Sequence, residues 1–140
     1  MCAERLGAIA LLLLLAACAG VAAQVREHTY PRDFEYVSHG EIHGVMGQLA
    51  AHVRSLDTLL AEGAPRDPAR RRQVVEHLEA MEHIARALGS GDVRSNHARL
   101  DEGIDAFRGR LTSARRAAQA EPPNYYLAGS VSGACRYCHH

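Results

Sequence analysis

Apolar residues in this chain recur three and four positions apart over three long stretches, which is the spacing of an α-helix that buries one face. The first helix is expected over residues 33–62, with Asp33 as its cap. The second opens at Asp67 and Pro68, a capping residue followed by a first-turn proline, and the third covers about 93–120. The expected buried seams are Ile42, Met46, Leu49, Val53, Leu56 and Leu60; Val74, Leu78, Met81, Ala85 and Leu88; and Leu100, Ile104, Phe107, Leu111, Ala114 and Ala118.

Glycine or proline follows each stretch, at 63–65, 89–91 and 122–123. A shorter segment, 124–139, comes last and contains two glycines, so its helix propensity is the weakest. The chain also lacks clusters of β-branched residues bounded by turns, which strands require, and its fold class is therefore expected to be all-α. Four helices with short connections predict an antiparallel, up-down-up-down four-helix bundle.

The last residues are Cys135-Arg136-Tyr137-Cys138-His139-His140, which contain CxxCH, the attachment signature of a c-type haem. Two cysteines three positions apart lie on one face of a helical turn, so both thiols can reach the vinyl groups of one haem and form thioethers. The next residue, His139, can offer its imidazole to the iron. The motif predicts one covalent haem c on Cys135 and Cys138, with His139 as the proximal iron ligand.

Two other interpretations of the motif stay open. The first is zinc in a zinc-binding or structural lipoprotein, although the consecutive residues Cys138, His139 and His140 rarely close one tetrahedron together. The second is a disulfide between Cys135 and Cys138, which would close a very small loop and stabilise little. Neither interpretation assigns a role to His139.

The chain begins like an export signal, with Arg5 ahead of an apolar run that is too short to span a membrane. Residues 1–23 are predicted to be this signal peptide. The run ends in Leu-Ala-Ala-Cys18, which resembles a bacterial lipobox and predicts a lipid anchor at Cys18 on the periplasmic side of a membrane. The alternative is cleavage before Gln24, which would release a soluble periplasmic protein. Residues 24–32 then form a polar tether, and 33–140 form the haem domain.

The sixteen basic residues are all arginines and equal the sixteen acids, so the formal net charge is zero. A nucleic-acid partner would favour a basic surface, and none is expected. The arginine run at 70–72 is expected to lie on a solvated helix face. Because no nucleophile and base are paired as catalysis requires, the chain is not predicted to be an enzyme.

An exported chain of four helices that ends in CxxCH resembles the cytochrome c-prime family. The match is most specific over 128–139, where glycines and alanines lead into the haem motif, and Gly44-Val45-Met46-Gly47 is similar to the family's first helix. The resemblance implies one haem in a four-helix bundle, which is often a homodimer. The sequence differs from the family after His139. Family members usually continue with a basic residue on the proximal side of the iron, whereas this chain ends at His140.

The resemblance implies that the first helix faces the sixth coordination position of the iron. His39, His43 and Met46 lie there at spacings of four and three, on one helix face. Met46 and His43 are preferred as the sixth ligand, because His39 lies near the fraying helix start. His52 and His77 are expected on the surface.

A haem iron with a sixth protein ligand is typical of electron transfer, so the expected partner is a redox protein. The alternative is a five-coordinate haem, as in family members that bind the gases NO or CO.

Overall fold

The structure is a computed structural model, and the chain divides into a unit Met1–Phe34 and a unit Glu35–His140. The residues that the structure describes are 25, 29, 34–62, 67–89 and 94–139. The expected signal peptide, with Cys18, and nearly all of the tether lie outside them. Within the described residues the chain is mostly helical, as an all-α fold requires. No helix among them is long and apolar enough to cross a membrane.

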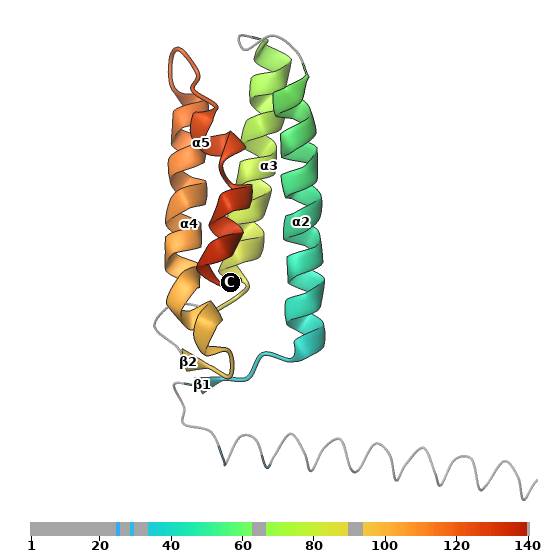
Figure 1. Cartoon of the computed structure of the whole chain (residues 1–140), viewed down its shortest axis with the longest axis vertical. Coiled ribbons are helices and arrows are strands. Elements are labelled where there is room, and N and C mark those ends of the chain that lie inside the picture. Colours follow the sequence, from blue (N-terminus) through green and yellow to red (C-terminus); the bar gives the residue numbers. More distant parts are fainter. Residues whose placement is uncertain (1–24, 26–28, 30–33, 63–66, 90–93, 140) are drawn as a thin grey trace, which may run out of the picture. The chain divides into compact units, whose positions relative to one another are not determined.

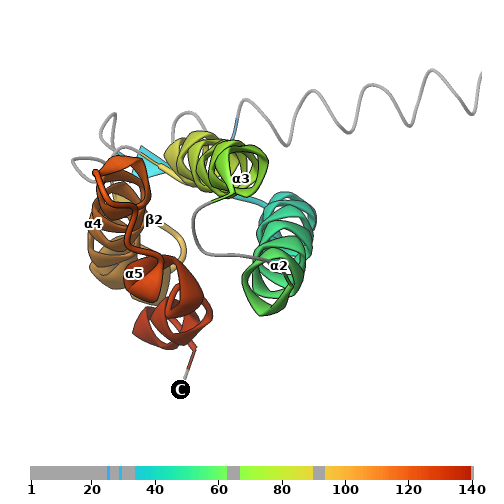
Figure 2. The ribbon, with the colours of Figure 1, turned by 90° about the horizontal axis from the view of Figure 1, so that it is seen from above.

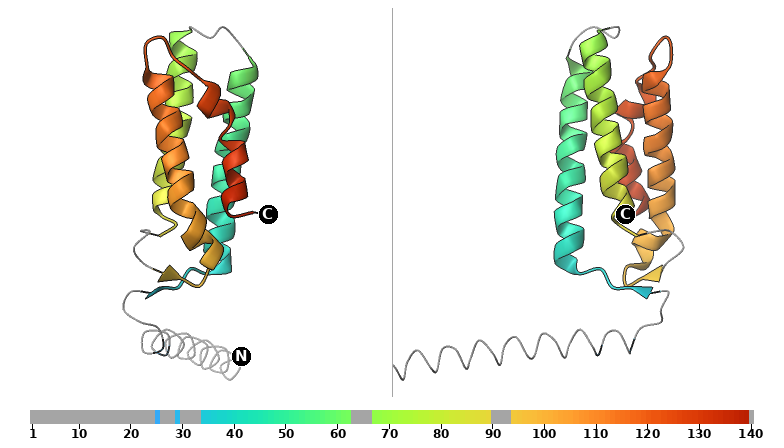
Figure 3. Two further views of the ribbon diagram at one scale, coloured as in Figure 1. Left: turned by 60° about the vertical axis from the view of Figure 1, so that its left-hand side comes forward. Right: turned by 180° about the vertical axis from the view of Figure 1, so that it is seen from behind.

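Three long helices make up most of the second unit: α2 (His39–Ala61), α3 (Pro68–Arg86) and α4 (Ala98–Gln119). Figures 1 and 3 show that they lie side by side and alternate in direction. Seen from above in Figure 2, α3 lies between α2 and α4. Two short strands, β1 (Phe34–Glu35) and β2 (Arg94–Ser95), form a two-stranded sheet.

The C-terminal segment returns along α4 and is not one continuous helix. A single α-helical turn, α5 (Tyr126–Gly129), is followed by the 3₁₀ helix η1 (Ser132–Tyr137). The fourth helix expected over 124–139 is therefore broken. Gly129 and Gly133 weaken an α-helix by about 1 kcal/mol each relative to alanine, which accounts for the interruption. Both α5 and η1 pack on α4, and α5 also contacts α2.

Helix α2 begins later than expected, because Ser38 caps it through a capping box. The Ser38 hydroxyl accepts from the Glu41 amide at 3.2 Å, and the Glu41 carboxylate accepts from the Ser38 amide at 2.7 Å. These hydrogen bonds hold the pKa of the Glu41 carboxyl below its usual value. The predicted cap, Asp33, lies outside the described residues.

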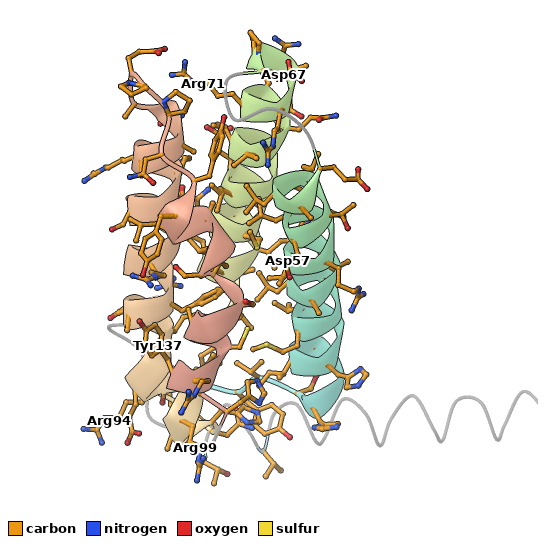
Figure 4. The ribbon with its side chains drawn as sticks, turned by 45° about the horizontal axis from the view of Figure 1, so that its top comes forward. Asp57, Asp67, Arg71, Arg94, Arg99 and Tyr137 are labelled. Carbon is orange, nitrogen blue, oxygen red and sulfur yellow. The ribbon has the colours of Figure 1, made fainter. Side chains whose placement is uncertain are left out.

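The prediction for the start of α3 is confirmed. The Asp67 carboxylate accepts from the Ala69 amide at 2.9 Å, and Pro68 occupies the first turn. Figure 4 shows Asp67 and Arg71 at the same end of α3. Helix α4, by contrast, begins at Ala98 and not near 93. Asp101 holds the preceding strand β2 in place by accepting from the amide and hydroxyl of Ser95.

Two arginines fix helix ends to neighbouring elements. Arg70, expected on a solvated face, is instead 7% exposed and donates to the carbonyls of Leu59 and Leu60 at the end of α2. Arg108 on α4 donates to the Ala85 carbonyl near the end of α3. The last carbonyls of a helix lack partners inside that helix, and Arg70 supplies donors to two of them at the end of α2. The Ala85 carbonyl also accepts from the Leu88 amide, so Arg108 adds a further donor there.

Every residue of the two predicted seams over 74–88 and 100–118 is buried, and these seams form most of the core. The α2 seam differs, since only Leu49 and Leu56 are buried and Met46 and Val53 are half-buried. The neighbouring helices therefore cover the apolar seam of α2 only in part. The rest of this apolar face borders a space that other side chains do not fill.

Candidate functional site

That space is a cavity of about 370 Å³, a volume within the range of ligand pockets in proteins. Its walls come from α2, α4, the residue Leu88 just after α3, and the C-terminal segment. The lining residues are Met46, Leu49, Ala50, Val53, Arg54, Leu88, Leu100, Ile104, Phe107, Ala134, Cys135, Cys138 and His139. Most are apolar, so the cavity suits a ligand with a large apolar body.

All three cysteine and histidine residues of the CxxCH motif line this cavity. Cys135 belongs to η1, and Cys138 and His139 follow directly. The Cys138 and His139 amides both donate to the Cys135 carbonyl, at 3.3 and 3.0 Å, which closes one helical turn. This turn places two thiols and an imidazole at one wall of an apolar space. Both cysteines are free, so the structure contains no disulfide between Cys135 and Cys138.

The close approach of the motif to α4 depends on Gly103. A β-carbon at that position would lie 2.5 Å from the Cys138 sulfur and 2.9 Å from the Tyr137 carbonyl oxygen. Real β-carbons do not come this close to other atoms, so only glycine allows the C-terminal segment to lie where it does. In the sequence, Gly103 lies within an amphipathic helix, and nothing there signals this contact.

Burial raises the pKa of the Cys138 thiol above its ordinary value, and the neighbouring Cys135 raises it further. Cys138 is half-buried, whereas Cys135 is exposed. At neutral pH the Cys138 thiol therefore stays protonated and is a poorer nucleophile than an ordinary cysteine.

The three candidate sixth ligands lie in different surroundings. Met46 is half-buried and lines the cavity from α2. His43 is exposed and is not among the lining residues, and the same holds for His39, whose ring centroid lies 6.2 Å from that of His43. Of the three, Met46 is the side chain that shares a cavity with Cys135, Cys138 and His139.

Arg54 is the one arginine among the lining residues, and no sequence pattern marks it as part of a site. It is exposed on α2, one position beyond the seam residue Val53. The seam residues Ile104 and Phe107, predicted only as core, line the cavity as well. Sequence periodicity identifies an apolar face without telling which part of it meets another helix and which part meets a ligand space.

His52 and His77, expected on the surface, are both half-buried and face each other across α2 and α3. Their Nδ1 atoms are 2.9 Å apart, and the rings meet edge to face with centroids 5.2 Å apart. The prediction for this pair was wrong, because it took each histidine separately on its own helix.

The donor set at the cavity suits a covalently bound haem: two thiols, one imidazole and one thioether around an apolar space. Within the part of the chain that the structure describes, no group of three or more histidine, cysteine or acidic side chains is gathered for a metal ion alone. His140 lies outside that part.

Comparisons with protein-family models, with curated proteins and with solved structures find no match to this chain.

Proposed function

We propose that this chain is an exported c-type cytochrome that carries one haem c and transfers electrons to a redox partner protein. The observation that supports this proposal most is that Cys135, Cys138 and His139 line one apolar cavity. A CxxCH motif on an open surface would leave a large apolar macrocycle exposed to water. This motif instead lines an apolar cavity, which could shield the macrocycle from water.

When bound, the haem supplies one-electron redox chemistry, and the residues of the chain hold and surround it. The thiols of Cys135 and Cys138 would form the two thioethers, and the His139 imidazole would bind the iron. Apolar side chains such as Phe107 and Ile104 exclude water and so lower the local dielectric. The Met46 thioether, on the α2 wall, is the preferred sixth ligand and would raise the reduction potential.

The proposal includes the finer architecture that the resemblance to cytochrome c-prime implies. In it, α2, α3, α4 and the broken C-terminal segment form an up-down-up-down bundle around the haem. The incompletely buried seam of α2 supports this view, because a bound macrocycle would cover the apolar side chains that neighbouring helices leave uncovered. Cys18 would anchor the domain to the periplasmic side of a membrane.

The test is to produce the chain together with a c-type haem attachment system and to measure the mass of the denatured protein. Wild type should carry the haem increment and show a low-spin spectrum. The variant Cys135→Ser/Cys138→Ser should lack the increment, and Cys18→Ser should retain it, since the latter changes only the proposed anchor. A wild-type mass without haem would refute the proposal.

The spectrum also decides between the two haem functions. A six-coordinate, low-spin iron suits electron transfer, because its coordination changes little between oxidation states. If the haem is attached but the spectrum is high-spin and carbon monoxide binds readily, the iron is five-coordinate and gas binding is the better account.

A further inference from the structure

The pair of His52 and His77 has no part in the proposed haem site. A separation of 2.9 Å between the two Nδ1 atoms is a hydrogen-bond distance. A neutral imidazole carries one N–H and one bare nitrogen, so one Nδ1 donates and the other accepts. The contact therefore fixes a particular proton count: one proton between the two facing nitrogens.

One ring can be protonated on the nitrogen that faces away from the pair, and the contact then persists between a positive and a neutral ring. Once both rings are protonated, both facing nitrogens are donors and two positive rings meet in a half-buried site, so the contact breaks. Two charged groups act on His77 beside its burial: His52 from α2 and Glu76 from α3. Burial is the largest cause and lowers the pKa of His77, the charge of His52 lowers it further, and Glu76 raises it by a smaller amount.

The position of the pair connects it to the cavity. Helix α2 packs mainly on α3 and has a smaller contact with α5. The face of α2 that carries Met46, Ala50 and Val53 borders the cavity. In the sequence, His52 lies between the lining residues Ala50 and Val53. The contact between His52 and His77 on α3 therefore also fixes the position of the α2 residues that line the cavity.

We propose that His52 and His77 form a proton-sensitive clasp, which holds α2 on α3 at neutral pH and releases the α2 wall of the cavity on acidification. A histidine whose pKa is lower in the folded protein binds fewer protons there than in the unfolded chain. Stability from the clasp is then fully present above the ordinary histidine pKa of about 6.5 and is lost as pH falls below it. The ligand environment in the cavity would respond to the acidity of the surroundings.

Nuclear magnetic resonance of the histidine rings tests the contact directly. In the full chain under reducing conditions, we expect a ¹⁵N–¹⁵N coupling between the two Nδ1 atoms at about pH 8 and its disappearance at about pH 5. Independent titration of both rings near pH 6.5, without coupling, would overturn the proposal.

Hydrogen exchange tests the release of α2. Between about pH 8 and pH 5, protection factors of amides in 46–54 should fall in wild type, by at most tenfold for each unit by which the pKa of His77 is lower in the folded than in the unfolded chain. Amides of α4 should change less. In His52→Gln/His77→Gln this pH dependence of α2 should vanish, whereas the control His43→Gln/His83→Gln, with two exposed histidines on the same helices, should keep it.

Equal pH dependence of α2 in wild type and in the paired variant would refute the clasp. The single variant His77→Gln gives the same test with a smaller change to the interface. Neither experiment requires a haem, so a failed clasp and a failed haem assignment can be told apart.

Discussion

Replacing Gly103 by alanine should separate the C-terminal motif from α4. The new β-carbon would start 2.5 Å from the Cys138 sulfur and 2.9 Å from the Tyr137 carbonyl oxygen. Ordinary contacts between non-bonded heavy atoms are about 3.5–4.0 Å, so the segment must retreat by about 1 Å. A backbone carbonyl cannot swing aside as a flexible side chain can, and the whole turn that carries Cys138 has to move.

Two effects of opposite sign determine the change in stability. Alanine in a helix interior is more favourable than glycine by about 1 kcal/mol. Overpacking of a tight contact costs about 1–3 kcal/mol. The expected net result for Gly103→Ala is between no change and a loss of about 2 kcal/mol in the free energy of unfolding.

Gly109 provides the matched control, because it lies in the same helix and nothing is within 4 Å of the position of its β-carbon. Gly109→Ala should stabilise the chain by about 1 kcal/mol. Urea unfolding followed by circular dichroism measures both variants, and the gap between them isolates the clash. If Gly103→Ala stabilises as much as Gly109→Ala, the C-terminal segment does not pack on α4 as described.

Three further outcomes can be checked. Met46→Ala should convert a low-spin haem to a five-coordinate, carbon-monoxide-reactive one, while His43→Ala should leave the optical spectrum unchanged because His43 lies off the cavity; the reverse result would make His43 the ligand. Iodoacetamide should label Cys138 more slowly than Cys135 in the haem-free chain near neutral pH, because burial raises the pKa of Cys138; equal rates, measured by peptide mass, would contradict this. Ser38→Ala should lower the free energy of unfolding by about 1 kcal/mol through loss of the α2 cap, and an unchanged urea midpoint would argue against the capping box.

The sequence predicted the helices best where one local signal was sufficient. Asp67 and Pro68 start α3 as expected, because a cap and a first-turn proline act on the backbone next to them. The α3 and α4 seams are buried because helical periodicity alone decides which residues share a face. The start of α2 was missed although Ser38 and Glu41 carry the serine-x-x-glutamate signature of a capping box.

Features that join distant segments were beyond such reasoning. Gly103 is needed because of a segment more than thirty positions later, and nothing near it in the sequence marks the contact. His52 and His77 meet only because α2 and α3 pack in one particular register. The motif residues Cys135, Cys138 and His139 line one cavity, and the position of Met46 among the lining residues and of His43 outside them depends on the rotation of α2, which helical periodicity does not give.

The half-buried seam of α2 affects how readily proteases degrade the chain in the cell. Without a ligand, α2 carries an apolar face that neighbouring helices cover only in part, and such an element opens locally more readily than the buried α3 and α4. Proteases cleave segments that open in this way. We therefore expect limited proteolysis of the haem-free chain to begin in α2, so that chains which fail to acquire a ligand are removed and those that acquire one persist.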